Sequence, residues 1–246
     1  MRLSVHIRKR LSSFDLDVRF DCEDKQLLAL IGPSGAGKTT IVRIIAGLDR
    51  PDTGRISFGD EIWVDTARGI FVPPQKRSLG YVFQDYTLFP HLNLYRNVSF
   101  AAGNTGHVRD LMKALDIWEL KDRKPHAVSG GERQRCAIAQ ALARGPKTLL
   151  LDEPFSALDI TNRRKLRERL KFLKGELSIP IIHVTHDIDE ALYLADEILP
   201  VVKGSIARKW IMQFLMKEPV RKAKIHSAGM NTGAAAGMKN TERKVS

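Results

Sequence analysis

The stretch Gly32–Thr39 combines residue types and a spacing that are suited to binding phosphate. Its sequence, GPSGAGKT, fits G-x-x-x-x-G-K-[ST], and it follows an apolar run and precedes a segment with helical apolar periodicity. Glycines let the backbone turn successive N–H groups toward phosphate oxygens, and the following helix adds its positive end. We expect a nucleotide-binding loop whose contacts come from Gly32, Pro33, Ser34, Gly35, Ala36, Gly37, Lys38, Thr39 and Thr40.

Within this loop, two side chains have distinct expected roles. The Lys38 ammonium is expected to neutralise the β- and γ-phosphates, and the Thr39 hydroxyl is expected to hold Mg²⁺. Hydrolysis also needs a carboxylate near the metal and a group that orients water. Asp152 and Glu153 follow the apolar run KTLLL, at the carboxyl end of an expected strand, where α/β proteins bind their ligands. We assign Asp152 to the Mg²⁺ shell through water and Glu153 to general base.

Two further side chains are candidates for the same site. His186 closes another apolar run, HVTHD, and is expected to reach the γ-phosphate or the attacking water. Gln84, in GYVFQDY, is a neutral amide that would ligate Mg²⁺ or position water from a loop that leads into a helical region. His183 lies inside its apolar run, so we interpret it as a hydrogen-bonded core histidine and exclude it from the site.

A second helix start carries the features of an anion site. Ser129 and Glu132 have the spacing of a capping box, and an apolar stripe follows before a stop at Gly145-Pro146. The backbone N–H groups of Ser129, Gly130 and Gly131 would therefore lie at a positive helix end. One γ-phosphate does not need two such helix ends from one subunit, whereas two subunits placed head to tail could supply one each. This predicts an ATP-dependent dimer.

The elements that must position these residues follow an α/β pattern. Apolar runs within 25–32, 147–154 and 178–187 are typical of buried parallel strands, and helical stretches separate them. Residues 54–65 indicate an antiparallel hairpin that turns at Gly59-Asp60, which would form a small β lobe. Between about 90 and 145 the pattern is helical, with Val108, Leu111, Met112 and Leu115 on one face, and we expect an inserted helical lobe.

Composition narrows the class of protein. The 246 residues are 43% hydrophobic and 28% charged, and no apolar run approaches the roughly 20 residues that cross a bilayer. The first residues lack the apolar region of a secretory signal, so we expect a cytoplasmic location. Cys22 and Cys136 have no metal-ligand spacing and are expected to be core residues. The net charge of +12 is concentrated from Lys203 onward, in a segment with ten Lys/Arg and two Asp/Glu.

Taken together, these motifs resemble the nucleotide-binding subunit of an ATP-binding cassette (ABC) transporter over residues 1–205. Gly32–Thr39 matches the Walker A motif, Gln84 the Q-loop, and Ser129–Glu132 the signature, written here VSGGE where LSGGQ is usual. Farther along, Thr148–Glu153 matches the Walker B motif with its base, Ser156 to Asp159 the D-loop, and His186 the switch histidine. Residues 206–246 are left as a basic tail, and its last 20 residues are expected to be disordered.

The resemblance implies a P-loop NTPase fold of the ABC ATPase type and hydrolysis of Mg-ATP at two composite sites. Across each site of a homodimer, Ser129, Gly130, Gly131, Glu132 and Asp159 would contact the nucleotide held by the other subunit. Gln84 and the helical lobe would couple to integral membrane permease subunits, and an extracytoplasmic substrate-binding protein would take part indirectly. The subunit would then lie at the cytoplasmic face of the membrane, without nucleic acid.

The stretch RGIFVPPQKRSLGYVFQDYTLFPHL resembles the importers of oxyanions, polyamines, iron and sugars, and within them we favour molybdate or tungstate. The roughly 40 residues after the cassette are too few for the oxyanion-sensing domain that such importers often carry. Phe14 is the nearest aromatic for stacking on adenine, although it lies closer to the Walker A motif than is usual. Importers of sulfate, iron, polyamine or sugar remain alternatives.

A soluble ABC ATPase acting on DNA or ribosomes is the remaining alternative. Repair and chromosome ATPases separate the Walker A and signature motifs by a long coiled coil, whereas only 90 residues lie between Lys38 and Ser129 here. Excision-repair proteins insert zinc-binding cysteines, and ribosomal ones carry two cassettes. Neither feature occurs in this sequence.

Overall fold

The computed structural model describes residues 1–85, 88–100, 102 and 105–210. Its strands form one eleven-stranded sheet in the order β6-β5-β4-β1-β2-β11-β10-β3-β9-β8-β7. The bounds of these strands are β1 Arg2–Arg10, β2 Asp15–Glu23, β3 Leu27–Ile31, β4 Thr53–Phe58, β5 Glu61–Asp65, β6 Ile70–Phe71, β7 Leu79–Val82, β8 Thr148–Asp152, β9 Ile181–Thr185, β10 Glu197–Val202 and β11 Ser205–Ile206.

Along the chain, most of the helices connect strands of the parallel part of the sheet. Short 3₁₀ turns span Pro74–Lys76, Trp118–Leu120 and Pro125–Ala127. The α-helices are α1 Lys38–Ala46, α2 Leu94–Ser99, α3 Thr105–Ala114, α4 Gly130–Leu142, α5 Ile160–Glu176 and α6 Ile188–Leu194. Both helix starts singled out in the sequence, at Lys38 and at Gly130, are therefore confirmed.

The parallel strands align the carboxyl ends from which the site residues project. Strands β10, β3, β9, β8 and β7 are parallel, and every residue of β3, β8 and β9 is buried. Such strands are apolar throughout because helices cover both of their faces. Ile31 pairs with Thr185, and Asp152 with Val184. This register brings the residues that follow each strand to one edge of the sheet.

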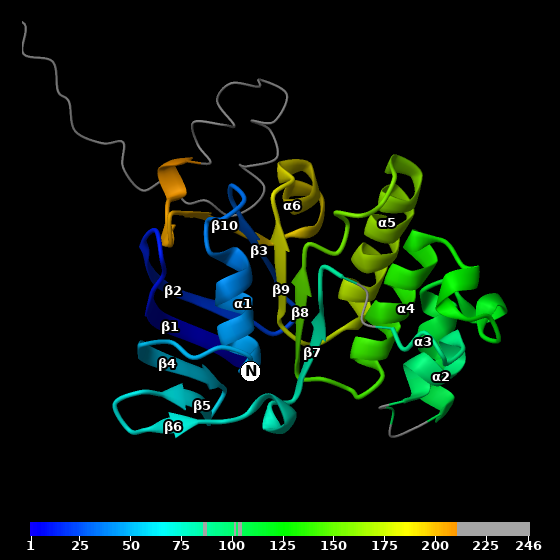
Figure 1. The fold of residues 1–246 in the computed structure, drawn as a ribbon, viewed down its shortest axis with the longest axis horizontal. Coiled ribbons are helices and arrows are strands. Elements are labelled where there is room, and N and C mark those ends of the chain that lie inside the picture. Colours follow the sequence, from blue (N-terminus) through cyan, green and yellow to red (C-terminus); the bar gives the residue numbers. More distant parts are fainter. Residues whose placement is uncertain (86–87, 101, 103–104, 211–246) are drawn as a thin grey trace, which may run out of the picture.

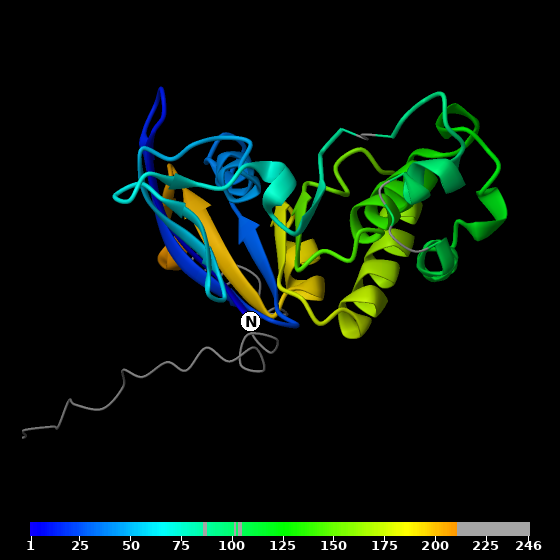
Figure 2. The ribbon, with the colours of Figure 1, turned by 90° about the horizontal axis from the view of Figure 1, so that it is seen from below.

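The antiparallel part is larger than the hairpin that the sequence predicts. Strands β4 and β5 turn at Gly59, as expected, and β1 and β2 extend the sheet beside them. In β1, buried Leu3, Val5 and Ile7 alternate with more exposed residues, which is the pattern of a sheet covered on one face. Figures 1 and 2 show these strands, in blue and cyan, on the opposite side of the parallel strands from α2–α5.

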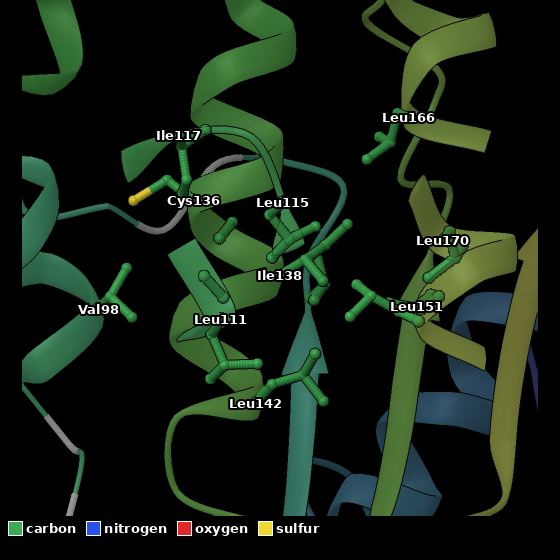
Figure 3. Close-up of a cluster of buried hydrophobic side chains, with 14 of the residues drawn as sticks. Val98, Leu111, Leu115, Ile117, Cys136, Ile138, Leu142, Leu151, Leu166 and Leu170 are labelled. Carbon is green, nitrogen blue, oxygen red and sulfur yellow. The ribbon is translucent and has the colours of Figure 1, made fainter. Parts of the chain in front are cut away.

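Helices α2, α3 and α4 follow β7 and precede β8, so the expected insertion of a helical lobe is observed. A buried cluster joins these helices to α5 and to the sheet. Its members include Val98 of α2, Leu111 of α3, Leu142 of α4, Leu151 of β8 and Leu166 of α5 (Figure 3). This packing fixes α4 and α5 relative to β8, the strand that ends in Asp152.

Some expectations concern the less regular parts of the chain. Trp210 packs against a small cluster around Ile31 and Ile188, whereas the basic tail beyond it, including the last 20 residues that are expected to be disordered, lies outside the described residues. Cys22 and Cys136 are buried and unpaired, as expected. Within the described part of the chain, no helix is long and apolar enough to span a membrane.

Replacing Gly32 by alanine should destabilise the fold strongly. Gly32 has φ 155°, and a Cβ there would lie 2.0 Å from the carbonyl oxygen of Val201 in β10. We expect a loss in unfolding free energy on the order of 3 kcal/mol, measured by urea denaturation. Gly35→Ala is the matched control, because its φ of 77° is strained but no atom lies within 4 Å of the new Cβ. It should lose about 1 kcal/mol, and equal losses would contradict the clash.

Candidate active site

The loop between β3 and α1 has the backbone of a phosphate cradle. Gly35 and Gly37 have φ of 77° and 98°, which residues with a Cβ rarely adopt, and Gly37 caps the N-terminus of α1. The side chain of Lys38 is almost fully buried, with 4% of the residue exposed, and its Nζ donates to the carbonyl oxygens of Gly32 at 2.7 Å and Pro33 at 3.0 Å. Burial lowers the pKa of Lys38, and the nearby Glu153 and Asp152 carboxylates oppose that shift.

An open cavity of about 560 Å³ lies over this loop. Residues 34–40 line it together with Ser12, Ser13, Phe14, Gln84 and Glu153. The structure therefore brings Gln84 to the phosphate loop although 44 residues separate it from Thr40. Phe14 also lies here, because its ring carbon Cε2 is 3.5 Å from the position of a Cβ on Gly37. The chain leads away from Phe14 along β2 and returns to the loop along β3, which runs in the opposite direction.

Asp152 is held at the end of β8 by two hydroxyl groups. The Thr39 Oγ1 donates to its Oδ1 at 3.1 Å, and the Tyr81 hydroxyl donates to its Oδ2 at 3.0 Å. Only 3% of the residue is exposed, and this burial raises the pKa of the carboxyl, while the two hydrogen bonds lower it. Thr39 and Asp152, which were predicted as metal ligands from distant parts of the sequence, thus already lie in contact.

The sequence reasoning missed Tyr81. It lies on β7 opposite Leu150 of β8, so its hydroxyl reaches the carboxylate at the end of the neighbouring strand. Burial raises the pKa of this phenol, and the negative charge of Asp152 raises it further. The hydroxyl therefore stays protonated and remains a hydrogen-bond donor. The aromatic residue was visible in GYVFQDY, but only the pairing of β7 with β8 reveals its partner.

Glu153 and His186 meet at the edge of the sheet. The His186 Nδ1 and the Glu153 Oε2 are 3.2 Å apart, although the two residues follow different strands. Glu153 has φ 47°, a left-handed conformation that costs energy for a residue with a side chain. Its backbone N–H donates to the carbonyl oxygen of Val184 on β9 at 3.0 Å. The strained backbone directs Glu153 toward the phosphate-loop cavity, which its side chain helps to line.

His183 is in the core, as expected, but the expectation that it is hydrogen-bonded is wrong. The residue has 0% exposure, and neither ring nitrogen has a hydrogen-bond partner among the described residues. Its ring packs edge-on against Phe155, with centroids 5.5 Å apart. Burial lowers the pKa of His183 to about 3, so the imidazole stays neutral. The Oε2 of buried Glu190 lies 4.0 Å from the His183 Nε2, which is too far for a hydrogen bond.

The second expected anion site lies at the start of α4. Ser129 Oγ accepts from the Glu132 backbone N–H, and Glu132 Oε2 accepts from the Ser129 N–H at 2.7 Å, which completes the capping box. Asp159 caps α5 by accepting from the Asn162 N–H at 2.9 Å. The two helix starts are neighbours, since a Cβ on Gly131 would lie 2.8 Å from the Asn162 Oδ1. Among the described residues, none of 129–132 or Asp159 lines the phosphate-loop cavity.

Comparison with known families places these groups in one protein class. The family model described as ABC transporter matches residues 16–156. The chain belongs to the ABC transporter family. It is therefore an ATPase that is coupled to transport, as the motifs predict.

The curated relatives are import ATP-binding proteins. The molybdate/tungstate import ATP-binding protein WtpC of Archaeoglobus fulgidus is 43% identical over 215 residues, which cover 85% of this chain and 87% of the relative. The molybdenum import ATP-binding protein ModC of Photobacterium profundum is 39% identical over 206 residues, which cover 83% of this chain and 58% of ModC. The sulfate/thiosulfate import ATP-binding protein CysA 2 of Agrobacterium fabrum is 41% identical over 232 residues, which cover 88% of this chain and 66% of CysA 2. The match thus spans about two thirds or less of the two bacterial proteins.

Solved structures confirm the predicted ABC ATPase fold. The cassette cbiO1 of Clostridium perfringens, described as part of the transporter complex cbiONQ, matches with a TM-score of 0.75 and 28% identity over 92% of this chain and 97% of that one. The cassette MJ0796, solved as a dimer, matches with a TM-score of 0.70 and 27% identity over 85% of this chain and 97% of that one.

Proposed function

We propose that the chain is the ATP-hydrolysing subunit of an importer for molybdate or tungstate, and that it closes as a homodimer around two Mg-ATP. The dimer is proposed because the residues of the predicted ATP site lie in two separate places on one subunit. The phosphate loop, Asp152 and Glu153 lie around one cavity, whereas the start of α4 does not line it. A second subunit placed head to tail would bring its Ser129, Gly130, Gly131, Glu132 and Asp159 to this cavity.

The residues present fit ATP and Mg²⁺. Mg²⁺ prefers oxygen ligands, and the Thr39 hydroxyl and Asp152 carboxylate lie 3.1 Å apart beside the cavity that Gln84 lines. The glycine-rich loop and Lys38 would hold the phosphates, with Phe14 against the base. Bound Mg²⁺ would supply charge neutralisation at the phosphates.

In this proposal Glu153 accepts the proton of the attacking water. His186 holds the Glu153 carboxylate through its Nδ1 and would contact the γ-phosphate. Both residues come from loops at the carboxyl edge of the sheet, so the water would approach from the open side of the cavity. Closure by a second subunit would exclude bulk water from this position.

The partners and substrate follow from the relatives. The names of the relatives and the complex that contains cbiO1 support separate integral membrane permease subunits, with this chain peripheral at the cytoplasmic face and an extracytoplasmic substrate-binding protein beyond. Molybdate or tungstate is favoured by WtpC and ModC, and sulfate is the second candidate because of CysA 2.

A pull-down tests this function directly. Tagged Glu153→Gln protein with ATP would be incubated with solubilised native membranes, and the bound proteins identified by mass spectrometry. We expect a multispan permease together with an oxyanion-binding protein, whose affinities for molybdate, tungstate and sulfate are then measured. Recovery of ribosomes or nucleic acid without a permease would contradict the transport role.

Replacing Tyr81 by phenylalanine should raise the Mg²⁺ concentration needed for half-maximal ATP hydrolysis about tenfold or more. The change removes one of the two hydroxyl groups that orient Asp152 and one cause that lowers its pKa. The expected size follows from the loss of a single hydrogen bond to a charged group, about 1.5–3 kcal/mol. Tyr95→Phe on α2 is the control and should leave the Mg²⁺ dependence unchanged. An unchanged dependence in Tyr81→Phe would show that Thr39 alone suffices to orient the carboxylate.

A further inference from the structure

A second cavity, of about 370 Å³, lies between α4, α5 and the turn that follows α3. It shares no lining residue with the phosphate-loop cavity, and none of its residues belongs to the predicted ATP site. Its lining consists of Asp116, Arg135, Lys165, Glu168, Arg169 and Phe172. Four of these six residues come from the exposed side of α5.

Arg135 is the unusual member of this cavity. Only 6% of the residue is exposed, yet its Nε has no hydrogen-bond partner among the described residues. A buried guanidinium is costly unless it is paired, and for that reason buried arginines are normally found against carboxylates or phosphates. Burial lowers the pKa of Arg135, but an arginine side chain remains protonated in proteins. Arg135 also lines the cavity, so the cavity wall contains a fixed positive charge, although the Nε atom itself is shielded from solvent.

The acidic groups of the cavity do not neutralise that charge by contact. Asp116 Oδ2 lies 3.7 Å from Arg169 Nη2, and Glu168 Oε1 lies 3.1 Å from the Nε of Arg164 on the preceding turn of α5. Each carboxylate thus has another arginine as its partner. Helix α5 as a whole contains seven Lys/Arg and two Glu, so the surrounding potential is positive. Among the described residues, Arg135 and Lys165 have no ion pair with a carboxylate, although the charges of Asp116 and Glu132 act on Arg135 from a distance.

We propose that this cavity binds a small oxyanion, with Arg135 and Lys165 as its two charge partners. A guanidinium presents parallel N–H groups that match two oxygens of one anion, and a lysine ammonium adds a point charge. The volume of 370 Å³ is many times the roughly 30 Å³ that a water molecule occupies, so a hydrated sulfate or phosphate fits. The site would link α4, which begins at the signature residues, with α5, which begins after Asp159.

Calorimetric titration with sodium sulfate at constant ionic strength tests this site. The full chain would carry Lys38→Ala, which weakens the phosphate loop as a competing anion site. Adding Lys165→Ala should weaken sulfate binding about tenfold, the loss expected for one charge-assisted contact. Lys171→Ala is the matched control, because Lys171 is an exposed cation of the same helix that contacts the ring of Tyr193 and does not line the cavity. It should leave sulfate binding unchanged.

Arg135→Gln should abolish saturable sulfate binding. Because Arg135 is buried and its loss could disturb folding, the exposed Lys165 carries the decisive comparison. Equal weakening in Lys165→Ala and Lys171→Ala would show that α5 attracts sulfate only through its overall charge and would overturn the proposal. Absence of saturable binding in the Lys38→Ala parent would overturn it as well. Neither result would bear on the proposed ATP site, because every variant compared carries the same Lys38→Ala change in the phosphate loop.

Discussion

Glu153→Gln should bind ATP and form a stable dimer, but hydrolyse ATP about 10²-fold or more slowly than the parent. An amide has nearly the shape of the carboxylate and can still hydrogen-bond the Nδ1 of His186, which lies 3.2 Å from Oε2. It cannot accept the proton of the attacking water. Steady-state phosphate release measures the turnover, and size exclusion with ATP measures the dimer.

Glu176→Gln provides the control for this change. Glu176 is an exposed residue at the end of α5, so the same loss of charge occurs far from the phosphate loop. Its turnover should equal that of the parent. Normal turnover in Glu153→Gln would refute the assignment of the general base and would direct attention to His186.

Ser129→Arg should retain ATP binding and lose ATP-dependent dimerisation completely. In the proposed dimer the start of α4 lies against the γ-phosphate of the other subunit, where a long side chain would separate the two surfaces. Nucleotide binding should persist, because no residue of 129–132 lines the phosphate-loop cavity within the described part of one subunit. Fluorescent-nucleotide titration and size exclusion measure the two properties separately.

Ser129→Arg also removes the N-terminal cap of α4, so this loss of stability must be distinguished from the block in dimer closure. Asn93 caps α2 as Ser129 caps α4, with its side chain accepting from the Arg96 backbone N–H. Asn93→Arg therefore loses a comparable cap, a cost of about 0.5–2 kcal/mol, but should still dimerise with ATP. An ATP-bound dimer of Ser129→Arg would contradict the head-to-tail arrangement.

The parts of the fold that could be predicted are those in which a local pattern determines the structure. The runs that form β3, β8 and β9 are buried throughout, so their apolar character is continuous and visible. The N-termini of α1 and α4 carry a phosphate-loop pattern and a capping box, which depend on a few adjacent residues. Strands β1 and β2 were not predicted, because polar residues at alternate positions interrupt the continuous apolar run that marks β3, β8 and β9.

The rest of the site depends on pairings that distant segments make. The contact of Tyr81 with Asp152 arises only because β7 and β8 are neighbours, and local sequence does not specify that order. The position of Phe14 beside Gly37 likewise depends on where β2 and β3 lie in the sheet. For His183, an apolar run correctly indicated burial, whereas its lack of hydrogen-bond partners follows from three-dimensional packing against Phe155.

Mixing two defective subunits tests the central claim that each ATP site is shared. One subunit would carry Lys38→Ala and the other Ser129→Arg, both in the Glu153→Gln background, and the ATP retained by the isolated dimer would be counted. If the sites are shared head to tail, the mixed dimer combines an intact phosphate loop with an intact signature, and it should retain one ATP although neither subunit alone forms a dimer. A mixture that retains no ATP would contradict the account, because it would mean that both motifs must act within the same chain.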